Sequence, residues 1–361
     1  MTRRLRVAHL PARTPYARKL IDDEFTIMNG SRAASGEIIP DALSVEWILA
    51  HRPLDWVDVL HLHHLEFEDE AALERLLTAC QDARVKVVHT VHDLAAMFGR
   101  TEDLHRKIRL VHGAGAGLVC LTDGSAADLA EVLGEDTKLR VAPHGYVVDP
   151  DTIASLDRPA DVNGPRYLIY GALRPNRDYL STIVNWSLQS HPSSARLHLL
   201  MRGLSLAHMA DAGQRAMELV QAVAADPRIE VTMRGYPTDI EIVAAGAAAD
   251  VLVMPYLWGT HSGQLELAFD LGLLPLVSDV GHLREQHAAH RGTWLVDEPE
   301  WFDWATGNPY TFGERFVAAL EHTEERLSTR RRRTDHRAFA DHRRTEHAAV
   351  LATYSAAYQE C

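Results

Sequence analysis

Short apolar runs alternate with amphipathic segments along nearly the whole chain, and this alternation restricts the fold more than any other feature. In the first half, runs of strand length occupy residues 6–10, 57–62, 85–91, 118–121 and 139–142, and helix-like segments occupy residues 68–83, 101–112 and 124–133. Strands that alternate with helices form βαβ units, whose strands pair in parallel. The first half therefore predicts a parallel α/β domain.

The same alternation starts again after a segment rich in proline, glycine and aspartate, residues 149–165, which has the composition of a linker. Beyond it we expect strands at residues 167–170, 197–201, 229–233, 251–254 and 274–277, and helices at residues 179–187, 206–225, 239–248 and 263–271. Residues 312–359 are helical in pattern and include the arginines 330–333, which we interpret as solvent-exposed. We therefore predict an amino-terminal domain 1–155, a carboxy-terminal domain 156–335, and a final helix 336–361 that packs back on the amino-terminal domain.

Composition limits the partners and the compartment. Of 361 residues, 50 are Asp or Glu and 37 are Lys or Arg, a formal charge of −13, whereas a general nucleic-acid-binding protein normally presents a basic surface. No apolar run reaches the roughly 18 residues of a membrane span, and the charged start is not followed by a signal-peptide stretch. The 3 cysteines lie far apart, which suits a reducing compartment. We expect a cytoplasmic protein without nucleic-acid partners, and the pattern predicts no particular oligomeric state.

The 21 histidines include His61, His63 and His64 in one short stretch. No Cys-x-x-Cys or His-Glu-x-x-His spacing accompanies them. We interpret these histidines as structural or solvated, and we expect no metal.

A loop in the second half has the features of a phosphate site. After the strand that ends near residue 255, the chain reads Thr260-His261-Ser262-Gly263, and a helix begins. Ser262 is suited to cap that helix, while Gly263 lets an anion approach its backbone N–H groups. Those N–H groups and the helix dipole favour a phosphate at this point.

A second loop follows the strand at residues 167–170. It begins at Gly171 and contains Arg174 and Arg177 around a turn. The guanidinium group keeps its charge and forms paired hydrogen bonds to phosphate oxygens, so the two arginines can neutralise a diphosphate. Because Rossmann-like domains bind ligands at the carboxyl ends of their strands, we expect both loops to belong to one site.

Taken in order, these segments resemble the retaining glycosyltransferases of family 4, which have the GT-B fold of two Rossmann-like domains with a cleft between them. Residues 171–177 are similar to that family's Gly-x-x-Arg-x-x-Lys loop, with arginine in place of lysine, and residues 260–281 are similar to the branch that reads Thr-Gln-Ser-Gly-Val-Leu. In the first half, residues 58–64, 87–94 and 141–145 resemble Asp-Val-Val-His-Leu-His-Trp, Val-Val-Trp-Thr-Val-His-Asn-Leu and Val-Ile-Pro-His-Gly. The resemblance covers roughly residues 55–285.

The resemblance implies a hexosyltransferase-type enzyme. It would move a sugar from a nucleotide diphosphate, UDP rather than GDP, to a hydroxyl of an acceptor, with retention and without a metal or other cofactor. The acidic balance and the lack of an apolar run of membrane-span length indicate a small soluble acceptor. An acidic cleft would suit a cationic one such as an aminocyclitol, and hence natural-product biosynthesis.

The resemblance also assigns residues to the site. The donor diphosphate and sugar would be bound by Gly171, Arg174, Arg177, Thr260, His261, Ser262, Gly263 and Gln264. Arg174 and Arg177 would stabilise the leaving diphosphate, and His92 would hydrogen-bond a sugar hydroxyl or orient the acceptor. Their positions at the ends of strands make Arg202, Gly203 and Tyr236 further candidates, for the base pocket, and His144 is a candidate for the cleft.

One departure from the family keeps alternatives open. Many members have Glu-x7-Glu before the glycine, but Gly259 and Leu267 occupy those positions here. Glu266 is one residue off, which turns it by about 100° around a helix. A nucleotide-sugar epimerase or a pseudo-glycosidic coupling enzyme on the same fold remains an alternative, as do a transferase for a polysaccharide or lipid-linked acceptor and a degenerate binding protein.

Overall fold

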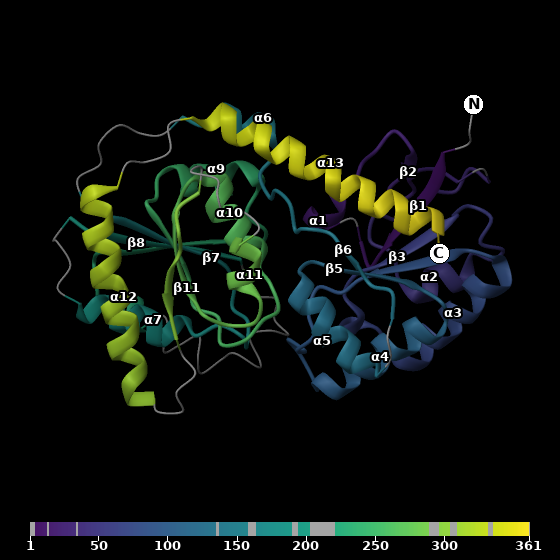
Figure 1. Ribbon diagram of the computed structural model, residues 1–361, viewed down its shortest axis with the longest axis horizontal. Helices are drawn as coiled ribbons and strands as arrows, with labels where there is room; N and C mark the ends of the chain where they lie inside the picture. Colours follow the sequence, from purple (N-terminus) through teal and green to yellow (C-terminus); the bar gives the residue numbers. More distant parts are fainter. Residues whose placement is uncertain are drawn as a thin grey trace. The chain divides into compact units, whose positions relative to one another are not determined.

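The computed structural model describes residues 4–12, 14–33, 35–134, 137–157, 164–189, 194–202, 221–288, 296–303, 309–330 and 335–360, with the backbone alone at residues 309–312. The chain forms two compact units, Met1–Gly145 with Thr345–Cys361 and Tyr146–Arg344 (Figure 1). The first boundary therefore lies after Gly145, whereas we predicted it after residue 155. No helix among the described residues combines the length and the apolar character needed to cross a membrane.

The amino-terminal unit contains a six-stranded sheet with the order β2-β1-β3-β4-β5-β6, and all its neighbouring strands are parallel. Its strands are β1 Leu5–Leu10, β2 Phe25–Ile27, β3 Val59–Leu62, β4 Lys86–Thr90, β5 Gly117–Cys120 and β6 Arg140–Val141. Because β2 pairs with one edge of β1 and β3 with the other, the strand order reverses at β1. Open α/β sheets bind ligands beyond the carboxyl ends of the strands at such a reversal.

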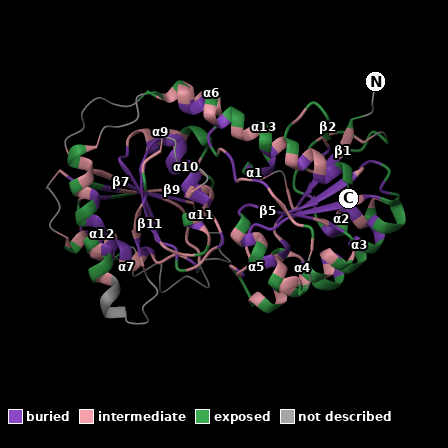
Figure 2. Ribbon diagram, in the orientation of Figure 1, coloured by how far each residue is buried: buried purple, intermediate pink, exposed green. Residues whose placement is uncertain are grey.

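The helices of this unit are α1 Pro15–Arg18, α2 Val45–Ala50, the 3₁₀ helix η1 Leu65–Phe67, α3 Glu70–Ala83, α4 Thr101–Gly113, α5 Asp123–Leu133 and the end of α13 His336–Glu360. Local sequence sets their ends. Asp69 caps α3 by accepting from the N–H of Ala72, and Thr122 and Ser125 form a reciprocal capping box at α5. Figure 2 shows buried strands with exposed residues on the outer sides of the helices.

The carboxy-terminal unit contains a second six-stranded sheet with the order β12-β11-β10-β7-β8-β9, again with parallel neighbours. Its strands are β7 Arg166–Ala172, β8 Arg196–Arg202, β9 Ile229–Arg234, β10 Val251–Met254, β11 Leu274–Ser278 and β12 Glu300–Phe302. Its helices are α6 Pro150–Ala154, α7 Tyr179–Leu188, α9 Asp239–Ala247, α10 Gly263–Leu271, α11 Leu283–Ala288, α12 Pro309–Thr329 and the start of α13. Here the order reverses between β7 and β10.

Helix α10 is buried at every position from Gln264 to Leu271, although it contains two acidic residues. Arg343 of α13, with a fully buried side chain, forms ion pairs of 2.7 Å with both Glu266 and Asp270. Asp270 also accepts hydrogen bonds from the N–H groups of Val147 (2.6 Å) and Val148 (2.9 Å). Both carboxylates of α10 therefore have ion-pair and hydrogen-bond partners inside the unit, as buried charges require.

The predicted α/β class and the parallel sheets are confirmed. The sequence pattern missed the short edge strands β2 and β12. The helical tail forms α12 and α13, and α13 matches the final helix predicted at residues 336–361. The expectation for Arg330 is wrong, because its side chain is only 6% exposed and pairs with Asp297 at 2.5 Å. Arg331, Arg332 and Arg333 lie outside the described residues, as does the predicted helix 206–225 apart from its end.

We predict that Arg343→Ala lowers the free energy of unfolding of the carboxy-terminal unit by about 3–5 kcal/mol, because removing one partner leaves buried charge uncompensated. Urea denaturation followed by circular dichroism measures this loss. The matched control is Arg344→Ala, since the adjacent Arg344 side chain is 46% exposed in its pairs with Asp151 and Asp341 and should contribute little. Equal losses in the two variants would contradict the prediction.

Candidate functional site

The two loops predicted to bind phosphate lie side by side at the reversal of the second sheet. Arg177, after β7, forms an isolated antiparallel bridge with Tyr256, after β10. The N–H of Leu257 donates to the carbonyl of Asn176 (2.8 Å), and Asn176 Nδ2 donates to the carbonyl of Trp258 (3.1 Å). The topology therefore brings together segments about 80 residues apart, as ligand sites of this sheet order require.

The guanidinium of Arg177 is held by phenol groups. Its Nη1 donates to the hydroxyl of Tyr179 (2.8 Å) and its Nη2 to the hydroxyl of Tyr256 (2.9 Å). The Tyr256 hydroxyl also lies 2.6 Å from Ser262 Oγ and 3.3 Å from Gln264 Oε1. One phenol thus joins Arg177 to the first turn of α10. The sequence interpretation missed both tyrosines, although Tyr256 directly follows a strand end and its proline.

Gly171, the end-of-strand residue predicted for this site, has a positive φ of 138°. A Cβ at this position would overlap Arg177 Nη1 and lie 3.0 Å from Gln264 Nε2. Gln264 Nε2 donates to the carbonyl of Tyr170. The missing side chain of Gly171 therefore allows an arginine and an amide to approach the end of β7.

The start of α10 is built as the sequence predicted for an anion site. Ser262 caps the helix by accepting from the N–H of Gln264 (3.0 Å), and Gly263 is its first residue. The Ser262 N–H donates to Gln286 Oε1 (2.9 Å), a contact that the sequence interpretation missed. The positive end of the helix dipole and the Arg177 guanidinium reach the same junction, so an anion there would be stabilised by both.

The loop before α10 is fixed through its backbone. Thr260 is buried and His261 half-buried, and the carbonyl of Thr260 accepts from the N–H of His282 (2.9 Å). Gly281 has a φ of 53°, and a Cβ there would overlap the carbonyl oxygen of Gly259. Close backbone packing thus explains the glycine after β11.

Two further arginines lie at neighbouring strand ends. Arg174 is half-buried in the loop after β7, and Arg202 ends β8 with its guanidinium carbon 3.3 Å from the centroid of the Tyr236 ring. Burial and, next, the nearby Arg174 charge lower the pKa of Arg202. Among the described residues no carboxylate forms an ion pair with Arg174 or Arg202. Tyr236 is 72% exposed after β9, and Gly203 lies outside the described residues.

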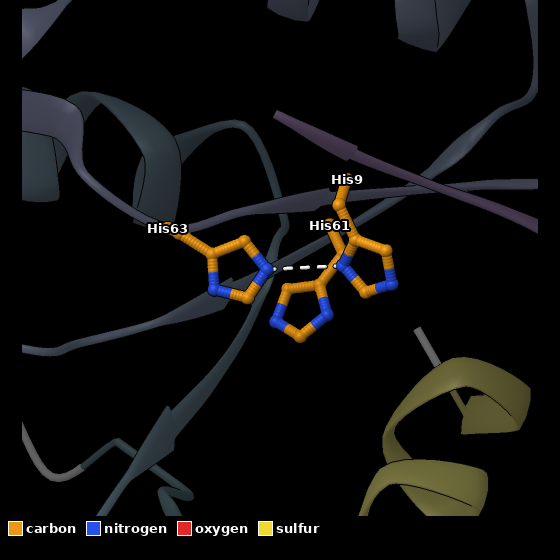
Figure 3. A group of neighbouring side chains, drawn as sticks. All are labelled: His9, His61 and His63. Carbon is orange, nitrogen blue, oxygen red and sulfur yellow. Dashed lines mark hydrogen bonds between the residues drawn. The ribbon is translucent and has the colours of Figure 1, made fainter. Parts of the chain in front are cut away.

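The reversal of the first sheet contains a group of buried histidines. His9 lies near the end of β1, His61 on β3 and His63 directly after it, with ligand-capable atoms all within 4.8 Å of one another (Figure 3). His63 lies 3.0 Å from His9 through its Nε2 and 3.0 Å from His92 through its Nδ1. The sequence interpretation missed His9, whose signal is a polar residue at the end of the first strand.

The partners of these histidines favour a structural hydrogen-bond network over a metal site. His61 Nδ1 lies 2.7 Å from the Tyr358 hydroxyl, and its Nε2 lies 2.8 Å from Thr90 Oγ1. Metal-binding histidines usually direct their second nitrogen to a carboxylate or carbonyl. His61 and His63 instead contact hydroxyls and other imidazoles.

His92 and His144, both predicted for the site, contact the same aromatic residue, Tyr16. The ring of Tyr16 meets His92 edge-on with centroids 5.0 Å apart and meets His144 in the same way at 5.2 Å. The Tyr16 hydroxyl lies 2.9 Å from that of Tyr354 on α13. The end of the chain therefore helps to position both histidines.

No protein-family model matches the chain, and no curated protein matches it. Solved structures do match along the whole chain. HepE from Anabaena, crystallised with UDP-glucose, is 14% identical, with 98% of this chain and 100% of that one covered and a TM-score of 0.66. A glycosyltransferase from Rickettsia africae is 13% identical (100% and 99% covered, TM-score 0.63). Sucrose-phosphate synthase from Thermosynechococcus elongatus is 14% identical (99% and 97% covered, TM-score 0.61).

These neighbours are GT-B proteins, and the likeness shows that this chain has their two-domain α/β fold. The predicted GT-B architecture is therefore confirmed. The closer resemblance to family 4 and its Ser-Gly branch stays a prediction, as do the roles of the site residues.

We predict that Tyr256→Phe destabilises the carboxy-terminal unit by about 1–3 kcal/mol, because Arg177 and Ser262 lose a buried hydrogen-bond partner. Chemical denaturation measures the change. Tyr236→Phe is the matched control, since that ring is 72% exposed, and it should unfold like the unaltered protein. If the stability of Tyr256→Phe is unchanged, the Tyr256 hydroxyl does not hold Arg177 and Ser262 together as described.

Proposed function

We propose that the protein is a glycosyltransferase that moves a sugar from a nucleoside diphosphate donor to a hydroxyl of a small acceptor. The observation that supports this proposal best is the junction of Arg177, Tyr256 and Ser262 at the start of α10, with Arg174 in the same loop as Arg177. A GT-B fold provides binding sites for such donors but does not by itself specify the reaction. HepE, a fold neighbour, was crystallised with UDP-glucose, which favours UDP over GDP here.

In the proposed reaction the bond between the sugar C1 and the diphosphate oxygen breaks, and its electron pair goes to the diphosphate. The acceptor hydroxyl oxygen forms the new bond to C1 on the same face, and its proton passes to an oxygen of the leaving diphosphate. This front-face route retains the anomeric configuration through an oxocarbenium-like pair. Arg174, Arg177 and the start of α10 stabilise the charge that develops on the leaving group. In this scheme they take the part that a divalent cation plays elsewhere.

The remaining predicted residues have complementary places in this scheme. Arg202 and Tyr236, whose guanidinium and ring are stacked, offer a flat surface to the base. Thr260 and His261, in the loop before α10, face the sugar end of the donor. His92 hydrogen-bonds a hydroxyl of the sugar or the acceptor, and His144 supports the same region.

One observation keeps a second reaction in view. Glu266, the nearest carboxylate to the family's sugar-binding glutamate, is engaged by Arg343 (2.7 Å) and by Gln286 Nε2 (2.7 Å). It therefore supplies no carboxylate to the sugar hydroxyls. An epimerase or a pseudo-glycosidic coupling enzyme would also use such a site. Product analysis separates them, because an epimerase converts the donor without an acceptor.

We predict that UDP raises the melting temperature in the presence of EDTA, since binding to the native state stabilises it.

Arg174→Ala should weaken UDP binding by about 10- to 100-fold, the value of one charge-assisted hydrogen bond. Isothermal titration calorimetry measures the dissociation constant. The control is Arg196→Ala. Arg196 is exposed at the start of β8, at the other end of this strand from Arg202, and the variant should bind UDP as the unaltered protein does. Undiminished binding by Arg174→Ala would remove the diphosphate assignment.

We predict that His92→Ala reduces turnover by about 100-fold or more, because a hydrogen bond made as charge develops is lost. UDP binding should be unaltered, since the proposal assigns the diphosphate to other residues. Release of UDP from UDP-sugars with a panel of acceptors measures turnover. An equal loss of UDP affinity would show that His92 acts on the nucleotide instead.

A further inference from the structure

The buried histidines of the first unit form a continuous chain that ends at His92. His9 Nδ1 lies 3.0 Å from His63 Nε2, and His63 Nδ1 lies 3.0 Å from His92 Nε2. His9 is fully buried, and His63 is 2% exposed. The chain therefore links the residue proposed to contact substrate with two rings that solvent barely reaches.

The middle ring is uncharged at neutral pH. Burial and then the neighbouring His61 and His9 lower the pKa of His63 well below its ordinary value. A neutral imidazole has one N–H and one acceptor nitrogen. The N···N distances of 3.0 Å are those of hydrogen bonds, so each contact contains one hydrogen atom, donated by one ring and accepted by the next.

We propose that His9, His63 and His92 form a neutral imidazole chain in which all three rings have their proton on the same-named nitrogen, so that His9 and His63 fix the tautomer and orientation of His92. His9 and His63 are thus positioning residues. The catalytic part of this inference rests on the proposed function of His92, whereas the chain itself does not.

The same-nitrogen rule follows from the connections alone. If His9 donates from Nδ1, then His63 accepts at Nε2, has its proton on Nδ1 and donates to His92 Nε2, which leaves the His92 proton on Nδ1. If His92 donates from Nε2, the same reasoning places all three protons on Nε2. No other arrangement of neutral rings puts one hydrogen in each contact.

The consequence concerns how His92 meets a ligand. Because Nε2 of His92 faces His63, Nδ1 is the nitrogen that acts on a sugar or acceptor hydroxyl. In the first arrangement this nitrogen donates and in the second it accepts, so its role depends on the tautomer that the three rings share. Tyr16, edge-on to His92 at 5.0 Å, limits rotation of the ring, so that tautomer and direction are set together before substrate binds.

Long-range ¹H–¹⁵N correlation spectra of protein labelled with ¹⁵N-histidine test the chain, since ¹⁵N shifts distinguish the two tautomers and the charged form. We expect His9, His63 and His92 to share one neutral tautomer. In His63→Phe, which keeps a ring but removes both nitrogens, the ¹⁵N shifts of His92 should move towards a mixture of tautomers. Mixed tautomers or a charged ring in the unaltered protein would overturn the proposal.

His89→Leu is the matched control. His89 is a buried histidine on the adjacent strand that contacts the carbonyl of Leu62 (3.1 Å) and takes no part in the chain. The variant should lose a buried imidazole without altering the ¹⁵N shifts of His92. A change as large as that in His63→Phe would show that the His92 shifts respond to any loss of packing and not to the imidazole chain.

Zinc titration is a second experiment. Saturable changes in the ¹⁵N shifts of His9 and His63 at micromolar zinc would make the group a metal site and refute the neutral chain.

Kinetics with any active donor and acceptor pair provide a separate readout. His63→Phe should reduce kcat by about 10- to 100-fold, the range seen when a metal-binding histidine loses its hydrogen-bond partner, while the KM for the donor stays within about twofold. His9→Asn keeps an amide where His9 Nδ1 lies and should recover part of the loss relative to His9→Phe. If His92→Ala is fully active but the tautomers agree, the chain stands and the proposed role of His92 in turnover fails. If turnover depends on His92 but the three rings have different tautomers, the role of His92 stands and the imidazole chain fails.

Discussion

Parallel pairing is the constraint on which the rest of this structure depends. Each parallel strand must be followed by a crossover before the next can pair, so the loops that leave the strands gather at one edge of each sheet. In the carboxy-terminal unit this brings Arg177 to Tyr256, and in the amino-terminal unit it brings His9 to His63. Neither pair is close in sequence. Both are close in space because the strand order reverses where they lie.

The sequence predicted most of the fold because buried parallel strands are short apolar runs that no other element imitates when helices separate them. It missed β2 and β12, since strands of three residues at a sheet edge have too little pattern to detect. It also misjudged Arg330, because a run of arginines resembles a solvated surface. The carboxylate of Asp297, which neutralises Arg330, is distant in sequence.

The candidate site was predictable only in part, and for a similar reason. Gly171, Arg174, Ser262 and Gly263 belong to local motifs and could be identified from spacing. Tyr179 and Tyr256 have no motif, since their importance arises from the position of the Arg177 guanidinium. Likewise, His9 gains a role only when β1 and β3 are paired. Contacts of this kind follow from tertiary structure, and a single sequence indicates them only weakly, through the position of a polar or aromatic residue at a strand end.

The buried charges of α10 have a consequence for how this protein can vary. Arg343 forms ion pairs with Glu266 and Asp270 at once, and Asp270 also accepts hydrogen bonds from the backbone N–H groups of Val147 and Val148. A neutral residue at position 343 leaves two buried carboxylates without their cation, and a neutral residue at position 266 or 270 removes one of the two ion pairs that hold Arg343. Related sequences should therefore either keep the whole trio or replace it together by apolar residues of similar volume, so that positions 266, 270 and 343 change as one unit during divergence.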